Sequence, residues 1–342
     1  MIAPARPTDL PGFDAVTRWL VVVAAMVFIM VVLGGITRLT QSGLSMVDWR
    51  PITGILPPLS EAAWNEVFNA YRRFPEYQRL NYGMTLAEFK AIFLMEYFHR
   101  LWGRLIGLVF ALPLVWFALR GQVRGRLALA LGGLLLLGGA QGVMGWVMVK
   151  SGLVDTPSVS AYRLAAHLGL AIAIYLSLLW LILTRTRRSA TDAVTRAWSR
   201  GALIAALVTI ASGAFVAGLD AGMTYNTFPL MDGQWVPDGL IAPEAGWANP
   251  FENVTMVQFN HRVLAILTLI VVLTLALRGR GATGAARTAA YAAGAMAVIQ
   301  VIIGITTLLL VVPVWAGALH QAGAMVLIGL LIWAVFESRH PA

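Results

Sequence analysis

The sequence contains no cysteine and few charged residues. Only 12% of its 342 residues are Asp, Glu, Lys or Arg, about half the share in an ordinary soluble protein. By contrast, 59% are hydrophobic, and the mean hydropathy is +0.76. The missing cysteines exclude disulfides, iron–sulfur clusters and thiolate-bound metals, which leaves histidine as the main soft-metal ligand. This composition excludes an ordinary globular enzyme and indicates a polytopic membrane protein.

Eight windows of about 20 apolar residues mark membrane crossings. Their approximate bounds are 18–37, 91–119, 127–149, 161–184, 197–219, 255–277, 287–311 and 314–337. Only the turn around Val312 and Pro313 separates the last two. The sequence therefore predicts an all-α polytopic membrane protein with eight transmembrane helices.

Arginines gather in three short loops, 120–126, 185–200 and 278–287. This bias predicts that these loops and both termini are cytoplasmic. The formal charge of +9 reflects the same loops, so nucleic acid is not an expected partner. The first 18 residues contain neither a transit segment nor a cleavage site, which favours a bacterial inner (plasma) membrane.

Two long loops are expected on the outer side of the membrane. Loop 38–90 contains an amphipathic pattern over Glu61–Phe74, which predicts a helix that covers the membrane interface. Loop 220–254 contains five acidic residues and no lysine or arginine. Neither composition is that of a spanning segment.

The chain also repeats itself. An offset of 179 residues relates the Gly34-Gly35 region to Ser212-Gly213, and Ser42–Ser45 to Ala221–Thr224. Further matched positions are Gln141-xxx-Gly145 with Gln300-xxx-Gly304, His99-Arg100 with His261-Arg262, and His167 with His320. We therefore predict two tandem pseudo-symmetric four-helix bundles, residues 1–190 and 191–342, in the same orientation.

Four of the five histidines occupy these matched positions near the outer ends of apolar helices: His99, His167, His261 and His320. A lone histidine in a span is as often a hydrogen-bonded structural residue as a ligand. Two symmetric pairs instead favour a b-type haem with one axial imidazole on each face. A zinc site would need further ligands that the sequence does not offer.

The surrounding residues fit a large flat ligand. A small residue follows each histidine by four positions: Gly103, Ala171, Ala265 and Ala324. Such residues let a macrocycle approach the helix, although the same spacing serves helix packing equally well. Four arginines are candidate partners for haem propionates: Arg38, Arg100, Arg163 and Arg262. Snorkelling of these arginines to the lipid headgroups is the alternative.

The two halves differ at one informative position. Glu96, three residues before His99, corresponds to Gln258, three residues before His261. A buried carboxylate can relay protons or stabilise a developing cation, whereas a glutamine cannot. We expect chemistry at the N-terminal site and a permanent haem at the C-terminal site. The alternative for Glu96 is an ion pair with Arg100, one turn further on.

Nearly the whole chain resembles the haem A synthase family. The most specific stretches are Gly34 to Met46, Trp49 to Gly54 with Pro57-Pro58, Phe89 to Arg104, Asn226 to Met231, and Asn260 to Arg262. Some bacterial members carry cysteine pairs in their outer loops, and this chain has none. In this respect, and in its long 38–90 loop, it looks more like the proteobacterial and mitochondrial branch.

The resemblance implies that the C8 methyl group of haem O becomes a formyl group, by two successive hydroxylations and loss of water. The product is haem A for aa3-type cytochrome oxidase. It further implies that Glu96 is catalytic, that His261 and His320 hold a resident haem b, and that His99 and His167 face the substrate haem. The implied partners are haem O, the lipid bilayer, a ferredoxin-like or quinol electron donor, haem O synthase and a second copy of the chain.

Two other functions compete with this one. A di-haem b-type electron carrier would also hold two bis-histidine haems, but four histidines at one depth argue against it, because electron transfer across the membrane favours haems at two depths. A haem transporter or chaperone would bind without reacting. The haems extracted from purified protein distinguish these functions.

Overall fold

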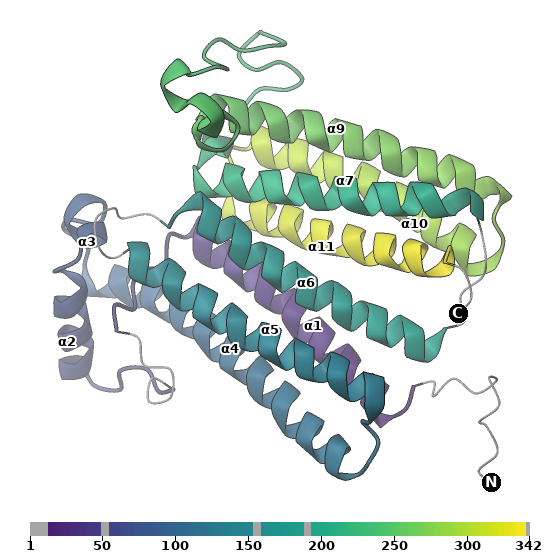
Figure 1. Ribbon diagram of the computed structural model, residues 1–342. Coiled ribbons are helices and arrows are strands. Elements are labelled where there is room, and N and C mark those ends of the chain that lie inside the picture. Colours follow the sequence, from purple (N-terminus) through teal and green to yellow (C-terminus); the bar gives the residue numbers. More distant parts are fainter. Residues whose placement is uncertain (1–12, 49–54, 153–158, 188–192, 340–342) are drawn as a thin grey trace.

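The computed structural model describes residues 13–48, 55–152, 159–187 and 193–339. Eight of its helices are long and apolar enough to cross a membrane. They are α1 (Ala15–Leu39), α4 (Leu86–Leu119), α5 (Gly125–Gly152), α6 (Ala161–Thr186), α7 (Ala193–Gly218), α9 (Val254–Arg278), α10 (Gly284–Leu309) and α11 (Val314–Glu337) (Figure 1). The predicted all-α fold and its eight spans are confirmed, and the chain is a multi-pass membrane protein.

Local signals explain several helix ends. The Asp14 side chain accepts from the backbone N–H of Thr17 and begins α1. Thr85 and Glu88 form a capping box that begins α4, five residues before the predicted span. The predicted span 287–311 ends earlier, at Leu309, because Val311 and Val312 adopt left-handed φ angles of 59° and 54°.

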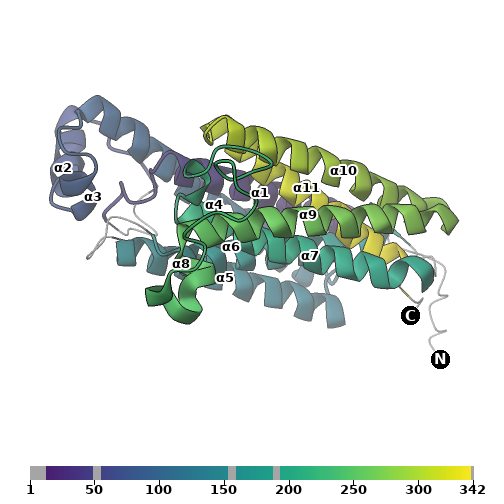
Figure 2. The ribbon, with the colours of Figure 1, turned by 90° about the horizontal axis from the view of Figure 1, so that it is seen from above.

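The spanning helices form two rings of four. In the first, α1 contacts α4, α4 contacts α5, α5 contacts α6, and α6 returns to α1. In the second, α7, α9, α10 and α11 follow the same order. The rings meet where α1 and α6 pack against α11 and α7 (Figures 1 and 2). In each ring the second and fourth helices, which carry the matched histidines, stand at opposite corners.

The core lies along the junction of the rings. Its fully buried members include Leu20 on α1, Leu178 on α6, and Ile328 and Leu331 on α11. Helices α4 and α5 lie further out, with large apolar side chains such as Leu112 and Leu129 exposed, as expected for surfaces that face lipid. The histidine-bearing helices α4, α6, α9 and α11 all contribute side chains to this core.

Two short helices cover the outer end of α4: α2 (Glu61–Tyr71) and α3 (Pro75–Arg79). The helix predicted over Glu61–Phe74 is therefore present, but it ends at Tyr71. Its apolar face packs on the protein, because the rings of Phe68 and Tyr71 lie 4.8 and 5.1 Å from that of Phe89. That face is buried against α4, and the predicted place of this helix at the membrane interface stays a prediction.

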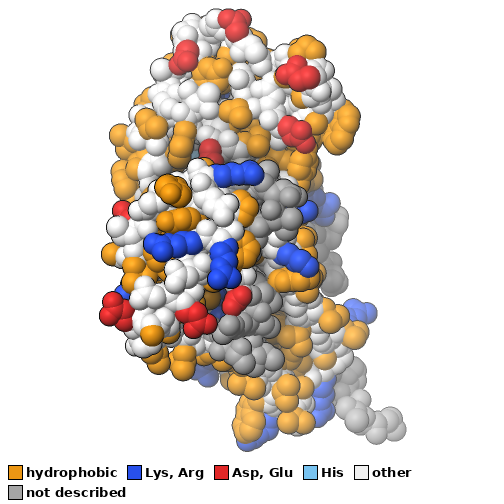
Figure 3. Space-filling model, turned by 90° about the vertical axis from the view of Figure 1, so that its left-hand side faces the viewer, with side chains coloured by type: hydrophobic (Ala, Val, Ile, Leu, Met, Phe, Trp, Pro, Cys, Tyr) orange, Lys and Arg blue, Asp and Glu red, His pale blue; other side chains and the backbone are white. Residues whose placement is uncertain are grey.

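The second outer loop contains short helical turns, η1 (Ala221–Met223), η2 (Pro243–Ala248) and α8 (Asn249–Glu252), and η3 (Gly279–Gly281) follows α9. Figure 3 views the end of the molecule that carries both outer loops. Acidic side chains gather at the top of this face, over the 220–254 loop, and basic ones lie across its middle (Figure 3). This end of the molecule therefore carries both acidic and basic side chains.

Candidate functional site

His99 on α4 is seated against α1. A Cβ atom added to Gly34 would lie 3.3 Å from its Cε1 atom, so the imidazole lies directly on the α1 backbone. The hydroxyl of Thr37 lies 3.0 Å from Nδ1 of His99 and donates its own hydrogen to the carbonyl of Leu33 at 2.8 Å. Because that hydrogen is used, the hydroxyl accepts from the ring. Nδ1 therefore carries the proton, and the Nε2 lone pair is available to a ligand.

His261 on α9 has the same environment on α7. A Cβ atom at Gly213 would lie 3.0 Å from its Cε1 atom. The hydroxyl of Ser212 lies 2.8 Å from Nδ1 and donates to the carbonyl of Thr209 at 2.7 Å. The same reasoning assigns the proton to Nδ1 and a free lone pair to Nε2.

His167 on α6 is held by α5. The side-chain amide of Gln141 donates to the backbone carbonyl of His167 at 3.1 Å and lies 3.3 Å from its Nε2 atom. Gly145, one turn further along α5, lies under the ring, where a Cβ would be 3.4 Å from Cε1. The buried Nδ1 of His167 finds no hydrogen-bond partner among the described residues, so one polar ring atom is left for a ligand or solvent.

His320 on α11 is held by α10 in a similar way, although a different ring nitrogen faces the glutamine. The amide of Gln300 donates to its backbone carbonyl at 2.8 Å and lies 3.2 Å from Nδ1. A Cβ at Gly304 would lie only 2.7 Å from Cε1. The sequence repeat identified these glutamines and glycines without assigning them a role, and their role is to hold the histidines.

The second pair of histidines faces across its ring of helices. The ring centroids of His261 and His320 are 6.5 Å apart, and the ring planes are at 85°. His99 and His167 occupy the corresponding opposite corners, α4 and α6, of the first ring of helices. Each bundle thus offers two imidazoles from opposite helices.

Glu96 lies one turn before His99 and is only 3% exposed. One carboxylate oxygen accepts from the hydroxyl of Ser45 and the backbone N–H of Met46, both at 2.7 Å. The other accepts from the guanidinium of Arg100 at 2.5 Å. The ion pair considered as the alternative from the sequence is therefore present, and the carboxylate also ties the outer loop to α4.

The second half builds this network without the carboxylate. Gln258 and Arg262 both donate to the backbone carbonyl of Tyr225, at 3.1 and 2.7 Å. Tyr225 corresponds to Met46, whose carbonyl accepts from Arg100 at 2.9 Å. In both halves an arginine therefore donates to a loop carbonyl. The halves differ in charge, because Glu96 of the first corresponds to Gln258 of the second.

The remaining predicted site residues are less closely tied to the histidines. Arg38 forms an ion pair with Asp220 at 2.9 Å, so its guanidinium already binds a carboxylate that joins the two halves. Arg163 is exposed near the start of α6. Three small residues are half-buried, Gly103, Ala265 and Ala324, and a Cβ at Gly103 would meet only the flexible end of Met30.

Helices α2 and α3 form a cap over the end of α4, and this outer cap contains a second buried acid, Glu76 on α3, which the sequence analysis did not single out. It accepts from the hydroxyl of Tyr71 at 2.9 Å, and Asn81 donates to that same hydroxyl at 2.7 Å. Burial raises the pKa of Glu76 to about 7; the Tyr71 bond opposes this shift, and the negative charge of Glu96 adds to it. The charge of Glu96 thus raises the pKa of a carboxyl group in the outer cap.

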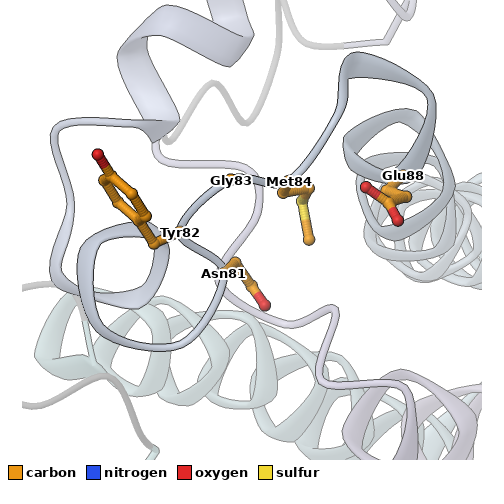
Figure 4. A pocket seen from close by; sticks show the side chains of 5 residues that line it. All are labelled: Asn81, Tyr82, Gly83, Met84 and Glu88. Carbon is orange, nitrogen blue, oxygen red and sulfur yellow. The ribbon is translucent and has the colours of Figure 1, made fainter.

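A surface pocket lies at the turn between α3 and α4, lined by Asn81, Tyr82, Gly83, Met84 and Glu88 (Figure 4). It is not near the histidines, because Glu88 precedes His99 by eleven residues, or about 16 Å of helix. Its one carboxylate accepts from the backbone N–H of Thr85 at 2.8 Å and serves the helix cap. The histidines therefore remain the candidate functional site.

In the part of the chain that the structure describes, no three His, Cys, Asp or Glu side chains cluster as ligands for a bare metal ion. Each pair instead provides two imidazoles on opposite helices. This donor set suits an iron whose other four ligands come from a macrocycle.

Comparison with known proteins identifies the family of the chain. The family model described as cytochrome oxidase assembly protein, COX15-CtaA, matches residues 17–332. The chain is 50% identical to a protein named haem A synthase from Paramagnetospirillum magneticum, over 94% of this chain and 93% of that protein. Similar proteins of the same name occur in Rhodospirillum centenum (50%; 99% and 91%) and Nitrosospira multiformis (48%; 94% and 92%). The chain belongs to the COX15-CtaA family of cytochrome oxidase assembly proteins.

Proposed function

We propose that this protein is a haem A synthase, an oxidoreductase that converts the C8 methyl group of haem O into the formyl group of haem A. Relatives with this name, about 50% identical over nearly the full length, support the activity. The observation that carries the proposal is the pair of imidazoles in each bundle. In each pair, one hydroxyl fixes the histidine tautomer that leaves Nε2 free for iron.

The C-terminal pair, His261 and His320, would hold a resident haem b. The facing rings support this assignment, and so do the small residues Ala265 and Ala324 one turn after each histidine. Arg262 is the candidate partner for a propionate. Its buried Nε has no hydrogen-bond partner within the described ranges, so one donor is free to bind an anion.

The N-terminal pair, His99 and His167, would face haem O as the substrate. Gly103 leaves room for a macrocycle against α4, since a Cβ there would touch only a methionine methyl group. Arg38, Arg100 and Arg163 are the candidate propionate partners. Of these, Arg100 is already bound to Glu96 and Arg38 to Asp220, so either would share its guanidinium between two carboxylates.

Glu96 is the residue to which we assign the chemistry. Oxidation of a methyl group removes electrons from its carbon, and a nearby carboxylate stabilises the positive charge that develops or accepts the proton that leaves. Haem b, if held by His261 and His320, would supply redox equivalents. Ser45, Met46 and Arg100 hold the carboxylate in place, so it is oriented before the substrate binds.

The test replaces Glu96 with Gln, which resembles the second half. E96Q should keep both haems, with the optical spectrum of bis-histidine iron, and should lose haem A among the extracted haems. Q258E is the matched control, because it adds a carboxylate at the corresponding place and should leave haem A production intact. Haem A at the wild-type level in E96Q would refute our assignment. Haem b as the only haem in both sites of the wild-type protein would favour the electron carrier.

We also propose the membrane arrangement. The arginine-rich loops 120–126, 185–200 and 278–287 favour cytoplasmic termini. The bacterial relatives favour a bacterial inner membrane. The rings of helices support a division into pseudo-symmetric bundles at residues 1–190 and 191–342. The electron donor is proposed as a class only, ferredoxin-like or quinol.

A further inference from the structure

A half-buried glutamine on α11 joins the two rings of helices. The side-chain amide of Gln321 on α11 donates to the backbone carbonyl of Val31 on α1 at 2.9 Å. It reaches that carbonyl by lying on Gly35, where an added Cβ would overlap the amide. Gly35 therefore leaves the space that this bond between the halves requires.

Both ends of this bond lie next to a histidine. Gln321 directly follows His320 on α11. Gly35 directly follows Gly34, on which the ring of His99 is seated, and Thr37 on the same turn orients that ring. Gly34 thus contacts His99 of the first pair. Gly35 contacts Gln321, the neighbour of His320 in the second pair.

The corresponding positions in the other direction are apolar. The offset of 153 residues between His167 and His320 relates Gln321 to Leu168, and the offset of 179 relates Gly35 to Ala214. Those residues belong to α6 and α7, which also pack against each other. Packing of the halves therefore does not require an amide at this level. A polar side chain in a span is costly unless it is bonded, so its use here calls for a specific explanation.

We propose that Gln321 is a positioning residue that couples the two pairs of histidines. A ligand bound by His261 and His320 fixes α11; Gln321 then holds the Gly34–Thr37 turn of α1, which seats His99. Filling the C-terminal pair tightens binding at the N-terminal pair, and the reverse holds by linkage. This inference rests on the proposed function, because the ligand at both pairs is haem.

The test measures the coupling itself. Haem O is titrated into detergent-purified protein whose C-terminal pair holds haem b, and into the H261A variant, which loses that haem without a change on α11. Soret absorbance gives the dissociation constant at the N-terminal pair. The dissociation constant of haem O in H261A, divided by that in the parent protein, should be about five or more, which is the lower end of common coupling strengths. In Q321L the ratio should fall to about one.

Two further variants keep the test decisive. G35A leaves Gln321 in place but fills the space that its amide needs, so it should lower the ratio as Q321L does, even if Q321L folds poorly. W19F is the control, because Trp19 donates to the carbonyl of Val109 at 2.7 Å and joins α1 to α4 within the first bundle only. It should keep the parent ratio. Failure of haem to bind either pair would refute the proposed function, whereas binding with an unchanged ratio in Q321L and G35A would overturn only the coupling.

Discussion

The hydroxyl of Ser212 accepts the Nδ1–H of His261 at 2.8 Å, because its own hydrogen is donated to the carbonyl of Thr209. One side chain on α7 thereby fixes both the orientation and the tautomer of an imidazole on α9. Outer partners of this kind raise the basicity of a ligand and hold its ring in place. Thr37 does the same for His99.

Replacement of Ser212 by Ala should therefore weaken haem binding at the second pair. Loss of such an outer partner typically costs about 10- to 100-fold in affinity. The measurement is a haem b titration followed by Soret absorbance. S212T keeps a hydroxyl and serves as the control, with binding close to that of the parent protein. Equal affinity in S212A and the parent would show that the hydroxyl does not prepare His261 for a ligand.

Gly304 should tolerate no side chain, because a Cβ would lie 2.7 Å from Cε1 of His320. G304A should displace the imidazole and reduce the haem b bound per protein at the C-terminal pair. Gly138 on α5 is the control, since a Cβ placed there meets no described atom within 4 Å beyond its chain neighbours and the nearby backbone of its own helix. G138A should keep its haem and gain up to about 1 kcal/mol of helix stability. A full haem content in G304A would contradict the placement of His320.

The features that sequence reasoning could predict are either local or repeated. A span needs only about 20 consecutive apolar residues, so hydropathy predicts all eight helices. The matched histidines, glutamines and glycines follow from the internal repeat. Thr37 and Ser212 do not: Thr37 lies three residues after Gly34, whereas Ser212 lies one residue before Gly213. The two hydroxyls thus come from positions that do not correspond in the repeat, yet they contact equivalent imidazoles. Only the three-dimensional structure reveals these contacts.

Contacts between distant segments could not be predicted for a related reason. Arg38 and Asp220 are 182 residues apart and form an ion pair because the first and second rings of helices meet. The apolar face of α2 has the pattern of an interfacial helix, but α4 extends outward far enough to cover it. In both cases the contact is made with a distant segment that the local sequence pattern does not specify.

Glu76 should make the outer cap less stable as the pH rises. The carboxyl has an ordinary pKa of 4.5 in the unfolded chain and one of about 7 in the folded cap. Between these values the unfolded chain has lost the proton while the folded cap retains it, so stability falls with pH and is level above about 7. A shift of this size corresponds to roughly 3 kcal/mol at most.

Hydrogen exchange of the α2 and α3 amides at pH 5 and pH 8, corrected for intrinsic rates, measures this effect. E76Q stays neutral and its amide oxygen can still accept from Tyr71, so its protection should be nearly independent of pH and greater than that of the parent at pH 8. E61Q removes an exposed carboxylate at the start of α2 and should keep the parent's pH dependence. Parent and E76Q curves of equal slope would exclude titration of Glu76 in this range.

The ion pair between Arg38 and Asp220 provides a test of the propionate assignment. The pair is partly solvated, with 22% and 47% of the two side chains exposed, so its loss should cost at most about 1 kcal/mol of stability. R38Q and D220N both remove it and should destabilise the protein equally. Their effects on haem O affinity should differ, because D220N frees the guanidinium for a propionate, whereas R38Q removes it. We expect a clear loss of affinity in R38Q and parent-like or tighter binding in D220N, measured by Soret titration at the N-terminal pair. If both variants bind haem O as the parent does, Arg38 only links the two halves, and the propionates must bind elsewhere.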